Sequence, residues 1–303
     1  MSIFKNPSWI NTELLKYEKL DDIPASIFDE VNTNLDKVLN QTNPIATIII
    51  AAWNEEANIV RCLYTLSKSQ TTFPFDIIVV NNNSKDRTQE TLDRLHVKSL
   101  FQVKQGCGPA RQWGQENALG KYILLADADC IYPKDWVQKM MEKLTEKDVV
   151  CVYGRYSFLV PEGKSRLKFV FFEFTKDVVA EIRHLNRPHL NAYGISMGYV
   201  KEYGLKAGYI DRNIRGDDGR LCFDMMPYGK VKQVRSRSAR VWTGARTLER
   251  DGSFSRAFLM RIVKEIFRIP RYFSKQAPHD TKTSENDDPE VLQVFEKKLK
   301  KSN

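Results

Sequence analysis

Three short segments of the chain are almost continuous runs of apolar residues, without the alternation typical of a sheet that faces water on one side. The runs are Ile45–Ala52 (IATIIIAA), Phe75–Val80 (FDIIVV) and Tyr122–Ala126 (YILLA). They are rich in β-branched residues and too short for buried helices. The pattern therefore predicts strands that are buried on both faces, as in a parallel sheet.

Helical patterns lie between these runs. Glu56–Ser69 places apolar residues at helical spacing, Arg87–Leu95 begins directly after Asp86, and Pro109–Leu119 follows a glycine-rich turn. Strands that alternate with helices over short links predict βαβ units. We therefore expect an α/β protein with a Rossmann-like, mostly parallel sheet flanked by helices.

The rest of the chain has a less regular pattern. Residues 1–43 are polar to amphipathic and predict a helical N-terminal extension, and residues 149–165 are expected to continue the sheet. Leu167–Ile182 predicts an aromatic-rich helix. Its start, Leu167–Phe174 (LKFVFFEF), could contact lipid or a sugar ring, with core packing as the default interpretation. Phe254–Phe273 predicts a basic amphipathic helix that packs on its own domain or contacts an anionic membrane. Residues 274–303 form a charged tail with helical character near 289–299.

Composition and net charge indicate the class of protein and the kind of binding partner. The 303 residues are 42% hydrophobic and 28% charged, the mix of a globular protein, and carry a formal net charge of +9. Such a charge favours nucleic acid, anionic lipid headgroups or phosphorylated substrates. The basic residues are dispersed and no recognition motif occurs, so we expect no nucleic-acid partner.

Cysteines, histidines and hydropathy exclude several other classes. The five cysteines are scattered and never spaced as CxxC, and the four histidines form no cluster. This predicts reduced thiols and no structural zinc site. No run of eighteen uncharged apolar residues occurs, and the N-terminus lacks the pattern of a secretory signal. We therefore expect a cytoplasmic protein without a membrane span.

Polar side chains gather directly after each of the three predicted strands. The segments are Trp53-Asn54-Glu55-Glu56, Asn81 to Thr88 (NNNSKDRT) and Asp127-Ala128-Asp129. Ligands of open α/β sheets bind at the carboxyl ends of the strands, so this layout predicts a nucleotide pocket. Ser84 and Asp86 also suit turns and helix caps, an alternative that does not explain the acidic turn after YILLA.

The acidic turn itself predicts a metal site. Two carboxylates one residue apart can face one hard divalent cation such as Mg²⁺ or Mn²⁺ and leave room for phosphate oxygens. A metal-bound nucleotide diphosphate is a better leaving group, because the cation absorbs the developing charge.

As an ordered set these segments resemble the motifs of family two glycosyltransferases with the GT-A fold. The segments that carry the resemblance are IIIAAWNEE (48–56), VVNNNSKDRT (79–88), GPARQWG (108–114) and LADAD (125–129). The match spans about residues 44–250. It implies a nucleotide-binding half over 44–130, an acceptor half over 131–250, and a C-terminal amphipathic helix and charged tail over 251–303.

The resemblance also implies residue roles. Ala51, Trp53 and Glu55 would line the base and ribose. Asn82 would contact the base, Arg111 would approach the base or diphosphate, Asp127 would bind the ribose or metal, and Asp129 would ligate the metal. The family commonly has an aspartate where this chain has Asn82, and an amide donates as well as accepts hydrogen bonds. Whether the donor base is uracil therefore stays open.

Residues 215–221 (RGDDGRL) hold the candidate catalytic base. A carboxylate opposite the departing diphosphate can take the acceptor proton in an inverting displacement. The family has an acidic pair here, and we assign Asp218 as the base with Asp217 as its neighbour. Spacing alone favours helix capping by these acids. Arg246, in VWTGAR (241–246), either neutralises the diphosphate or forms a surface ion pair.

Together these features predict metal-dependent transfer of a sugar from a nucleotide diphosphate sugar to a hydroxyl of a saccharide or a lipid-linked acceptor. No Q-x-x-R-W segment of processive synthases occurs, so we expect single addition. The resemblance implies assembly of a cell envelope polysaccharide or glycolipid, possible peripheral membrane contact and a location at the inner face of the plasma membrane. The alternatives are a sugar-phosphate nucleotidyltransferase, which would need a glycine-rich loop where this chain has Ala51–Glu55, and a non-catalytic nucleotide-binding scaffold at the membrane.

Overall fold

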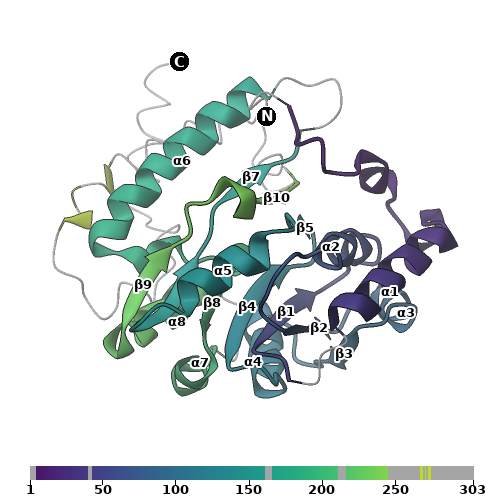
Figure 1. Ribbon diagram of the computed structural model, residues 1–303, viewed down its shortest axis with the longest axis horizontal. Coiled ribbons are helices and arrows are strands. Elements are labelled where there is room, and N and C mark those ends of the chain that lie inside the picture. The colour runs from purple at the N-terminus through teal and green to yellow at the C-terminus, as the bar shows by residue number, and fades with distance from the viewer. Residues whose placement is uncertain are drawn as a thin grey trace, which may run out of the picture.

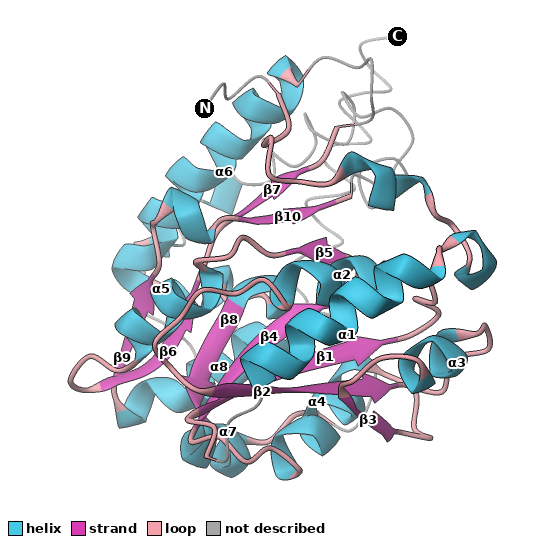
Figure 2. Ribbon diagram, turned by 45° about the vertical axis from the view of Figure 1, so that its right-hand side comes forward, coloured by secondary structure: helices cyan, strands magenta, loops and turns pink. Residues whose placement is uncertain are grey.

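A central sheet with helices on both faces organises the protein. The computed structural model describes residues 5–39, 43–160, 166–210 and 216–244, together with five residues between 267 and 273. Figures 1 and 2 show the sheet crossing the molecule, with the long helix α6 (Leu167–Asn186) running along one side.

The main sheet has seven strands in the order β3-β2-β1-β4-β8-β6-β9. β3, β2, β1 and β4 are parallel, while β8 is antiparallel to both β4 and β6. The strands are β1 (Ala46–Ala52), β2 (Phe75–Asn81), β3 (Lys98–Phe101), β4 (Tyr122–Asp127), β6 (Val149–Tyr153), β8 (Met197–Val200) and β9 (Lys230–Gln233).

Helices cover both faces of this sheet, which explains the unbroken apolar runs. In β1, Ile48 and Ile50 pack with the helices on one face, and Ile49 packs with those on the other. The first face is covered by α1 (Ala25–Leu39), α2 (Asn58–Leu66) and α5 (Trp136–Leu144). The second is covered by α4 (Cys107–Glu116), α7 (Lys201–Ala207) and α8 (Asp217–Met225).

A smaller sheet and several short helices complete the described part. The smaller sheet has the order β5-β10-β7, with β10 antiparallel to β5 and parallel to β7. The remaining elements are β5 (Cys130–Ile131), β7 (Tyr156–Phe158), β10 (Val241–Thr243), α3 (Thr88–Asp93) and the 3-10 helices at Thr12–Lys16, Leu20–Asp22, Pro188–Asn191, Gly194–Ser196, Met226–Tyr228 and Arg237–Ala239.

The predicted fold class is confirmed, with three corrections outside the βαβ part. Of the predicted range 149–165, residues 149–160 are described, and among these only β6 joins the main sheet, because β7 pairs with β10 instead. The two-residue strand β5 was not predicted. The default of core packing for the aromatic start of α6 is wrong for Leu167, Phe171 and Phe174, which are 58–65% exposed.

The structure also bears on the predictions for the cysteines, for membrane helices and for the two ends of the chain. All five cysteines are free thiols. Among the described residues, no helix is long and apolar enough to cross a membrane. The described part of the N-terminal extension packs Val31 and Leu35 of α1 into the core. The charged tail and most of the predicted helix Phe254–Phe273 lie outside the described residues.

One close backbone approach fixes how the chain enters β4. A Cβ added at Gly120 would lie 2.5–2.7 Å from backbone atoms of Ala46 and Thr47, which cannot move aside as a side chain can. We expect Gly120→Ala to lower the free energy of unfolding by about 2–3 kcal/mol. The matched control is Gly244→Ala, where no atom of the described residues lies within 4 Å of the added Cβ. Urea unfolding measures both, and equal midpoints for the two variants would contradict the expectation.

Candidate active site

The carboxyl ends of three neighbouring parallel strands form the floor of the candidate site. β1 lies between β2 and β4, with Ala52 opposite Asn81 and Ala51 opposite Asp127. The segments that follow the three strands therefore start at one edge of the sheet, as the sequence predicted.

Hydrogen bonds connect the loop after β1 with the loop after β2. The Asn54 backbone N–H donates to Ser84 Oγ (3.0 Å), and the Lys85 N–H donates to Asn54 Oδ1 (2.7 Å). Asn54 and Asn83 both adopt a φ of 56°, a left-handed conformation that asparagine tolerates better than most residues. The two loops thus form one rigid wall.

This wall carries the residues predicted to line the base and ribose. Trp53 is 52% exposed, and Ala51 is half-buried near the end of β1. The Glu55 carboxylate accepts a hydrogen bond from the Asn58 side-chain amide, and the Glu55 backbone N–H donates to Thr88 Oγ1 (2.8 Å). A large exposed aromatic ring beside fixed polar groups suits the stacking of a nucleobase or sugar.

Asn82 is only 3% exposed, and its amide holds the loop before α4. Its Nδ2 donates to the carbonyl oxygens of Lys104 (2.7 Å) and Gln102 (3.4 Å). Its Oδ1 accepts from the Gly106 N–H (2.7 Å). The described contacts of Asn82 are therefore structural, and they require an amide because a carboxylate cannot donate to the two carbonyls.

The acidic turn follows β4 directly. The Asp127 backbone N–H donates to the Tyr132 hydroxyl (2.8 Å), and that hydroxyl donates to the Ile195 carbonyl (3.0 Å). Burial in the site, together with the negative charges of Asp129 and Asp218, raises the pKa of Asp127 to about 6. Cys130 Sγ donates to Asp129 Oδ1 (3.4 Å).

The turn fits a divalent cation whose remaining ligands come from the substrate. The described residues contain no group of three or more His, Cys, Asp or Glu side chains that would hold a metal alone. Mg²⁺ and Mn²⁺ are commonly bound by one or two carboxylates together with substrate phosphates. The crowding of negative charge around Asp127 is the electrostatic environment that such a cation would relieve.

Arg111 of α4 joins the acidic turn to the predicted base. Its Nη2 donates to Asp127 Oδ1 (3.0 Å), and its Nη1 donates to Asp218 Oδ1. The Arg111 side chain is 7% exposed, whereas Asp218 and Asp127 are 16% and 37% exposed, so the guanidinium is buried and Asp127 stays open to solvent. A Cβ at Gly194 would lie 1.8 Å from Arg111 Nη2, so only glycine leaves room for the guanidinium there.

The two acids at the start of α8 have different surroundings. Asp218 Oδ2 accepts from the Gly194 N–H (2.8 Å), so each of its oxygens has one fixed donor. Asp217 is 5% exposed and accepts from Arg220 Nε (2.9 Å) and from the Ile210 N–H (3.1 Å). Burial raises the pKa of Asp217. Asp218 therefore faces Arg111 in the site, while Asp217 is bound by Arg220 and by the backbone of Ile210.

Two further residues need separate mention. Arg246, predicted to neutralise the diphosphate or to form a surface ion pair, lies outside the described residues. Burial raises the pKa of the Cys107 thiol to about 12, so this thiol is protonated at neutral pH.

Sequence reasoning did not find the roles of Tyr132 and Gly194. No local pattern marks a tyrosine that supports a turn five residues earlier, or a glycine that faces an arginine 83 positions away. Both roles depend on contacts between elements that are distant in the chain.

The mostly parallel α/β sheet with helices on both faces has the GT-A fold of glycosyltransferases. A mannosyltransferase from Pyrobaculum calidifontis, solved with GDP-Man and Mn²⁺, aligns over 86% of this chain and 77% of its own, with a TM-score of 0.53 and 15% identity. Glucosyl-3-phosphoglycerate synthase from Mycobacterium tuberculosis aligns over 80% and 85%, with a TM-score of 0.51 and 18% identity. At these identities the likeness concerns the fold alone.

Sequence comparison gives the family. Residues 47–200 match the model of glycosyl transferase family 2, which is half of the chain, and the chain belongs to this family. Glycosyltransferase AglE of Haloferax volcanii is 28% identical over 135 residues, 41% of this chain and 43% of the relative. An uncharacterized glycosyltransferase of Rickettsia felis is 31% identical over 161 residues, 51% and 26% respectively. The matched region thus spans less than half of either relative. The predicted family is confirmed.

The amide of Asn82 supplies a specific test of the site. In Asn82→Asp the carbonyls of Gln102 and Lys104 lose their donor and face a carboxylate, which should cost about 1–3 kcal/mol of stability. The matched control is Asn83→Asp, where one exposed hydrogen bond to the Val103 carbonyl is lost. We expect thermal unfolding to show a clear loss for position 82 and little change for position 83. An unchanged melting temperature in Asn82→Asp would show that the amide does not hold this loop.

Proposed function

We propose that the protein transfers a sugar from a nucleotide diphosphate sugar to an acceptor hydroxyl, with inversion at the anomeric carbon and with a divalent cation. The observation that carries the proposal is the placement of Asp127 and Asp218 on the two sides of Arg111. Asp127 lies at the carboxyl end of β4, the edge at which ligands bind in this type of sheet. Asp218 comes from α8, in the proposed acceptor half.

The donor half of the site would hold the nucleotide against the wall formed by the loops after β1 and β2. Ala51, Trp53 and Glu55 are the residues that we assign to the base and ribose, and Asn82 shapes the neighbouring loop. Mn²⁺ or Mg²⁺ held by Asp129 and Asp127 would absorb the negative charge that develops on the departing diphosphate. Arg246 is proposed to assist at the diphosphate.

Solved relatives of the fold support a metal and a nucleotide sugar. The Pyrobaculum mannosyltransferase was solved with GDP-Man and Mn²⁺, and the Mycobacterium synthase with Mn²⁺ and UDP-glucose. GalNAc-T7, with a TM-score of 0.53 and 16% identity, was solved with UDP, GalNAc and Mn²⁺. The bases differ among these proteins, so they do not fix the base that this chain prefers.

Asp218 is the group that we assign as general base. Its carboxylate is held by one N–H of Arg111 and by the Gly194 N–H, and its side chain is 16% exposed. The acceptor oxygen would attack the anomeric carbon as its proton passes to Asp218, while the bond from that carbon to the diphosphate oxygen breaks. Attack opposite the leaving group inverts the configuration. Arg111 acts as a positioning residue, because both of its terminal nitrogens are occupied by carboxylates.

We retain the finer expectations as parts of the proposal. They are single addition to a saccharide or a lipid-linked acceptor, a role in a cell envelope polysaccharide or glycolipid, and a cytoplasmic location at the inner face of the plasma membrane. Membership of family 2 disfavours the nucleotidyltransferase alternative. The non-catalytic scaffold is distinguished by the experiments below.

The first experiment identifies the donor and tests the metal. A panel of UDP- and GDP-sugars is screened by thermal shift, because a bound donor raises the melting temperature by mass action. Release of nucleotide diphosphate is then measured with Mn²⁺, with Mg²⁺ and with a chelator. We expect Asp129→Asn to lower turnover by at least about 100-fold. Asp29→Asn, on the exposed surface of α1, is the matched control. Donor binding without turnover in the wild type would favour the scaffold.

The second experiment separates the two acids of α8. Asp218→Asn should lower kcat by about 10²–10⁴-fold, because it removes the proton acceptor, and should also lower the melting temperature, because Arg111 loses one of its two carboxylate partners. Asp217→Asn should lower the melting temperature with a much smaller effect on kcat, since Asp217 binds Arg220 and the Ile210 N–H. Steady-state kinetics and thermal unfolding give both readouts. Full activity of Asp218→Asn would eliminate this residue as the base.

A further inference from the structure

One exposed tyrosine lies in the otherwise covered segment that leads into β8. Between Arg187 and Val200, Tyr193 is the one exposed residue, at 45% of its surface, and the others are buried or half-buried. A tyrosine ring has two apolar faces, which favour contact with other apolar surfaces. The position of this ring relative to the site therefore decides what it can bind.

Tyr193 directly precedes the glycine that binds the proposed base. The Gly194 N–H donates to Asp218 Oδ2 at 2.8 Å. The Tyr193 Cα lies one peptide bond from that nitrogen, and so no more than about 6 Å from the carboxylate oxygen. A hydroxyl that gives its proton to Asp218 must come within about 3 Å of the same carboxylate. The molecule that carries this hydroxyl therefore lies close to the Tyr193 side chain.

Two contacts fix the Tyr193 ring. Its hydroxyl accepts a hydrogen bond from Arg183 Nη1 (3.3 Å), and its ring packs at right angles to the Tyr156 ring, with 6.2 Å between the centroids. Arg183 is buried and also donates to the Leu190 carbonyl (3.1 Å), so this anchor is itself held. A ring that is fixed before a ligand arrives loses little conformational entropy on binding.

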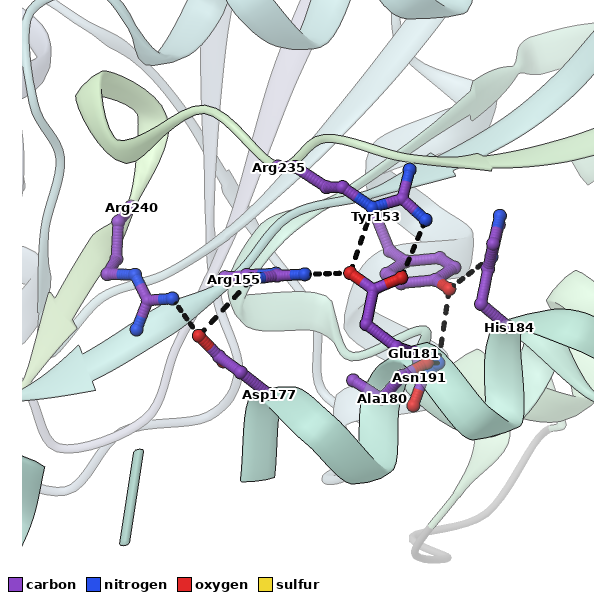
Figure 3. Close-up of polar contacts among 9 residues, drawn as sticks. All are labelled: Tyr153, Arg155, Asp177, Ala180, Glu181, His184, Asn191, Arg235 and Arg240. Atoms are coloured by element: carbon purple, nitrogen blue, oxygen red, sulfur yellow. Dashed lines mark hydrogen bonds and ion pairs between the residues drawn. The ribbon is translucent and has the colours of Figure 1, made fainter. Parts of the chain in front are cut away.

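The backbone on both sides of Tyr193 is fixed as well. On one side, Asn191 Nδ2 donates to the Ala180 carbonyl of α6 (2.8 Å) and to the Tyr153 hydroxyl (3.1 Å), as Figure 3 shows. On the other side, the Ser196 N–H donates to the Tyr193 carbonyl (3.0 Å). The exposed ring thus stands on a rigid segment.

The ring partner Tyr156 belongs to the smaller sheet, which begins at the acidic turn. β5 follows Asp129 directly, and β10 lies between β5 and β7. Tyr156 is the first residue of β7. The Tyr193 side chain therefore extends from the proposed base toward the sheet that continues from the proposed metal site.

We propose that Tyr193 is the platform on which a sugar ring of the acceptor stacks, so that the acceptor hydroxyl belongs to a saccharide. The C–H bonds on one face of a pyranose form an apolar surface that packs on an aromatic ring, while its hydroxyl groups stay free to reach Asp218. A phosphate group as acceptor would need a cation beside the base. Arg111 is already bound to two carboxylates, and Arg183 to a carbonyl and a hydroxyl.

This inference rests on the proposed function, because it takes Asp218 as the base, and it narrows the proposed acceptors to those that present a sugar ring. A platform depends on the ring of Tyr193, whereas a structural role would depend on the hydroxyl that binds Arg183. Phenylalanine keeps the ring and removes the hydroxyl, while serine removes the ring. The two substitutions therefore separate the two roles.

The test is saturation-transfer difference NMR of the full chain with methyl glycosides of glucose, galactose, mannose and N-acetylglucosamine, in the presence of Mn²⁺ and of UDP or GDP. We expect at least one glycoside to receive saturation on one face of its ring. Tyr193→Ser should reduce this signal at least about fivefold, whereas Tyr193→Phe should retain it. The matched control is Tyr228→Ser, at a tyrosine that is 48% exposed beyond the opposite end of α8 from Asp218, and it should give the wild-type signal.

Steady-state kinetics with the glycoside that gives the strongest signal tests the same role. Tyr193→Ser should raise the KM for the glycoside at least about tenfold without weakening the binding of UDP or GDP, because the ring contacts the acceptor alone. Tyr193→Phe should change this KM less than about twofold. Melting temperatures of both variants measure the loss of the hydrogen bond to Arg183, which they share.

Three results would overturn the inference. They are no saturation of any glycoside by the wild type, an undiminished signal in Tyr193→Ser, and equal losses in Tyr193→Phe and Tyr193→Ser. Release of nucleotide diphosphate that glycerol 3-phosphate stimulates and no glycoside does would likewise assign the acceptor to another class. Saturation that depends on the Tyr193 ring, without any release of nucleotide diphosphate, would support the sugar platform and contradict the proposed catalysis instead.

Discussion

A single buried guanidinium connects the parts of the candidate site. Arg111 lies between the carboxylates of Asp127 and Asp218, at 7% side-chain exposure. A buried arginine needs anionic partners, and two carboxylates on one guanidinium share its positive charge. The three groups therefore stabilise one another. Because they come from α4, the end of β4 and the start of α8, the same interaction fixes α8 against α4 and β4.

The surrounding structure supports that guanidinium. Asn82 holds the loop that starts α4, Tyr132 supports the acidic turn, and Gly194 leaves the space that Arg111 occupies. Each of these residues acts on a substrate only through another residue. This arrangement gives a site whose acidic groups are oriented before any ligand binds, which is the condition for efficient positioning of a donor and a base.

Outside the site, α6 combines ion pairs with exposed apolar side chains. Its acids bind the arginines of the neighbouring strands and loop, while Phe171 and Phe174 are 58% and 65% exposed. The periodicity of an amphipathic helix shows that it has an apolar side. Whether that side meets the protein core or an external surface depends on the elements packed around it.

The sequence by itself determined the βαβ part of the protein. Burial on both faces produces unbroken apolar runs, so β1, β2 and β4 and the polar segments after them were predictable, together with Asp127 and Asp129. It also located the acidic pair Asp217 and Asp218, because adjacent acids at a helix start form a local pattern.

Only the tertiary structure decided which partners these groups have. In the structure Asp218 pairs with Arg111, and Asp217 pairs with Arg220. The Asn82 amide binds the loop before α4, and Phe171 and Phe174 of α6 are exposed. The tertiary structure also placed β5, β7 and β10 in a second sheet. The physical reason is that periodicity and motif spacing record local geometry, whereas ion pairs, close approaches of glycine and burial arise between segments that are far apart in the chain.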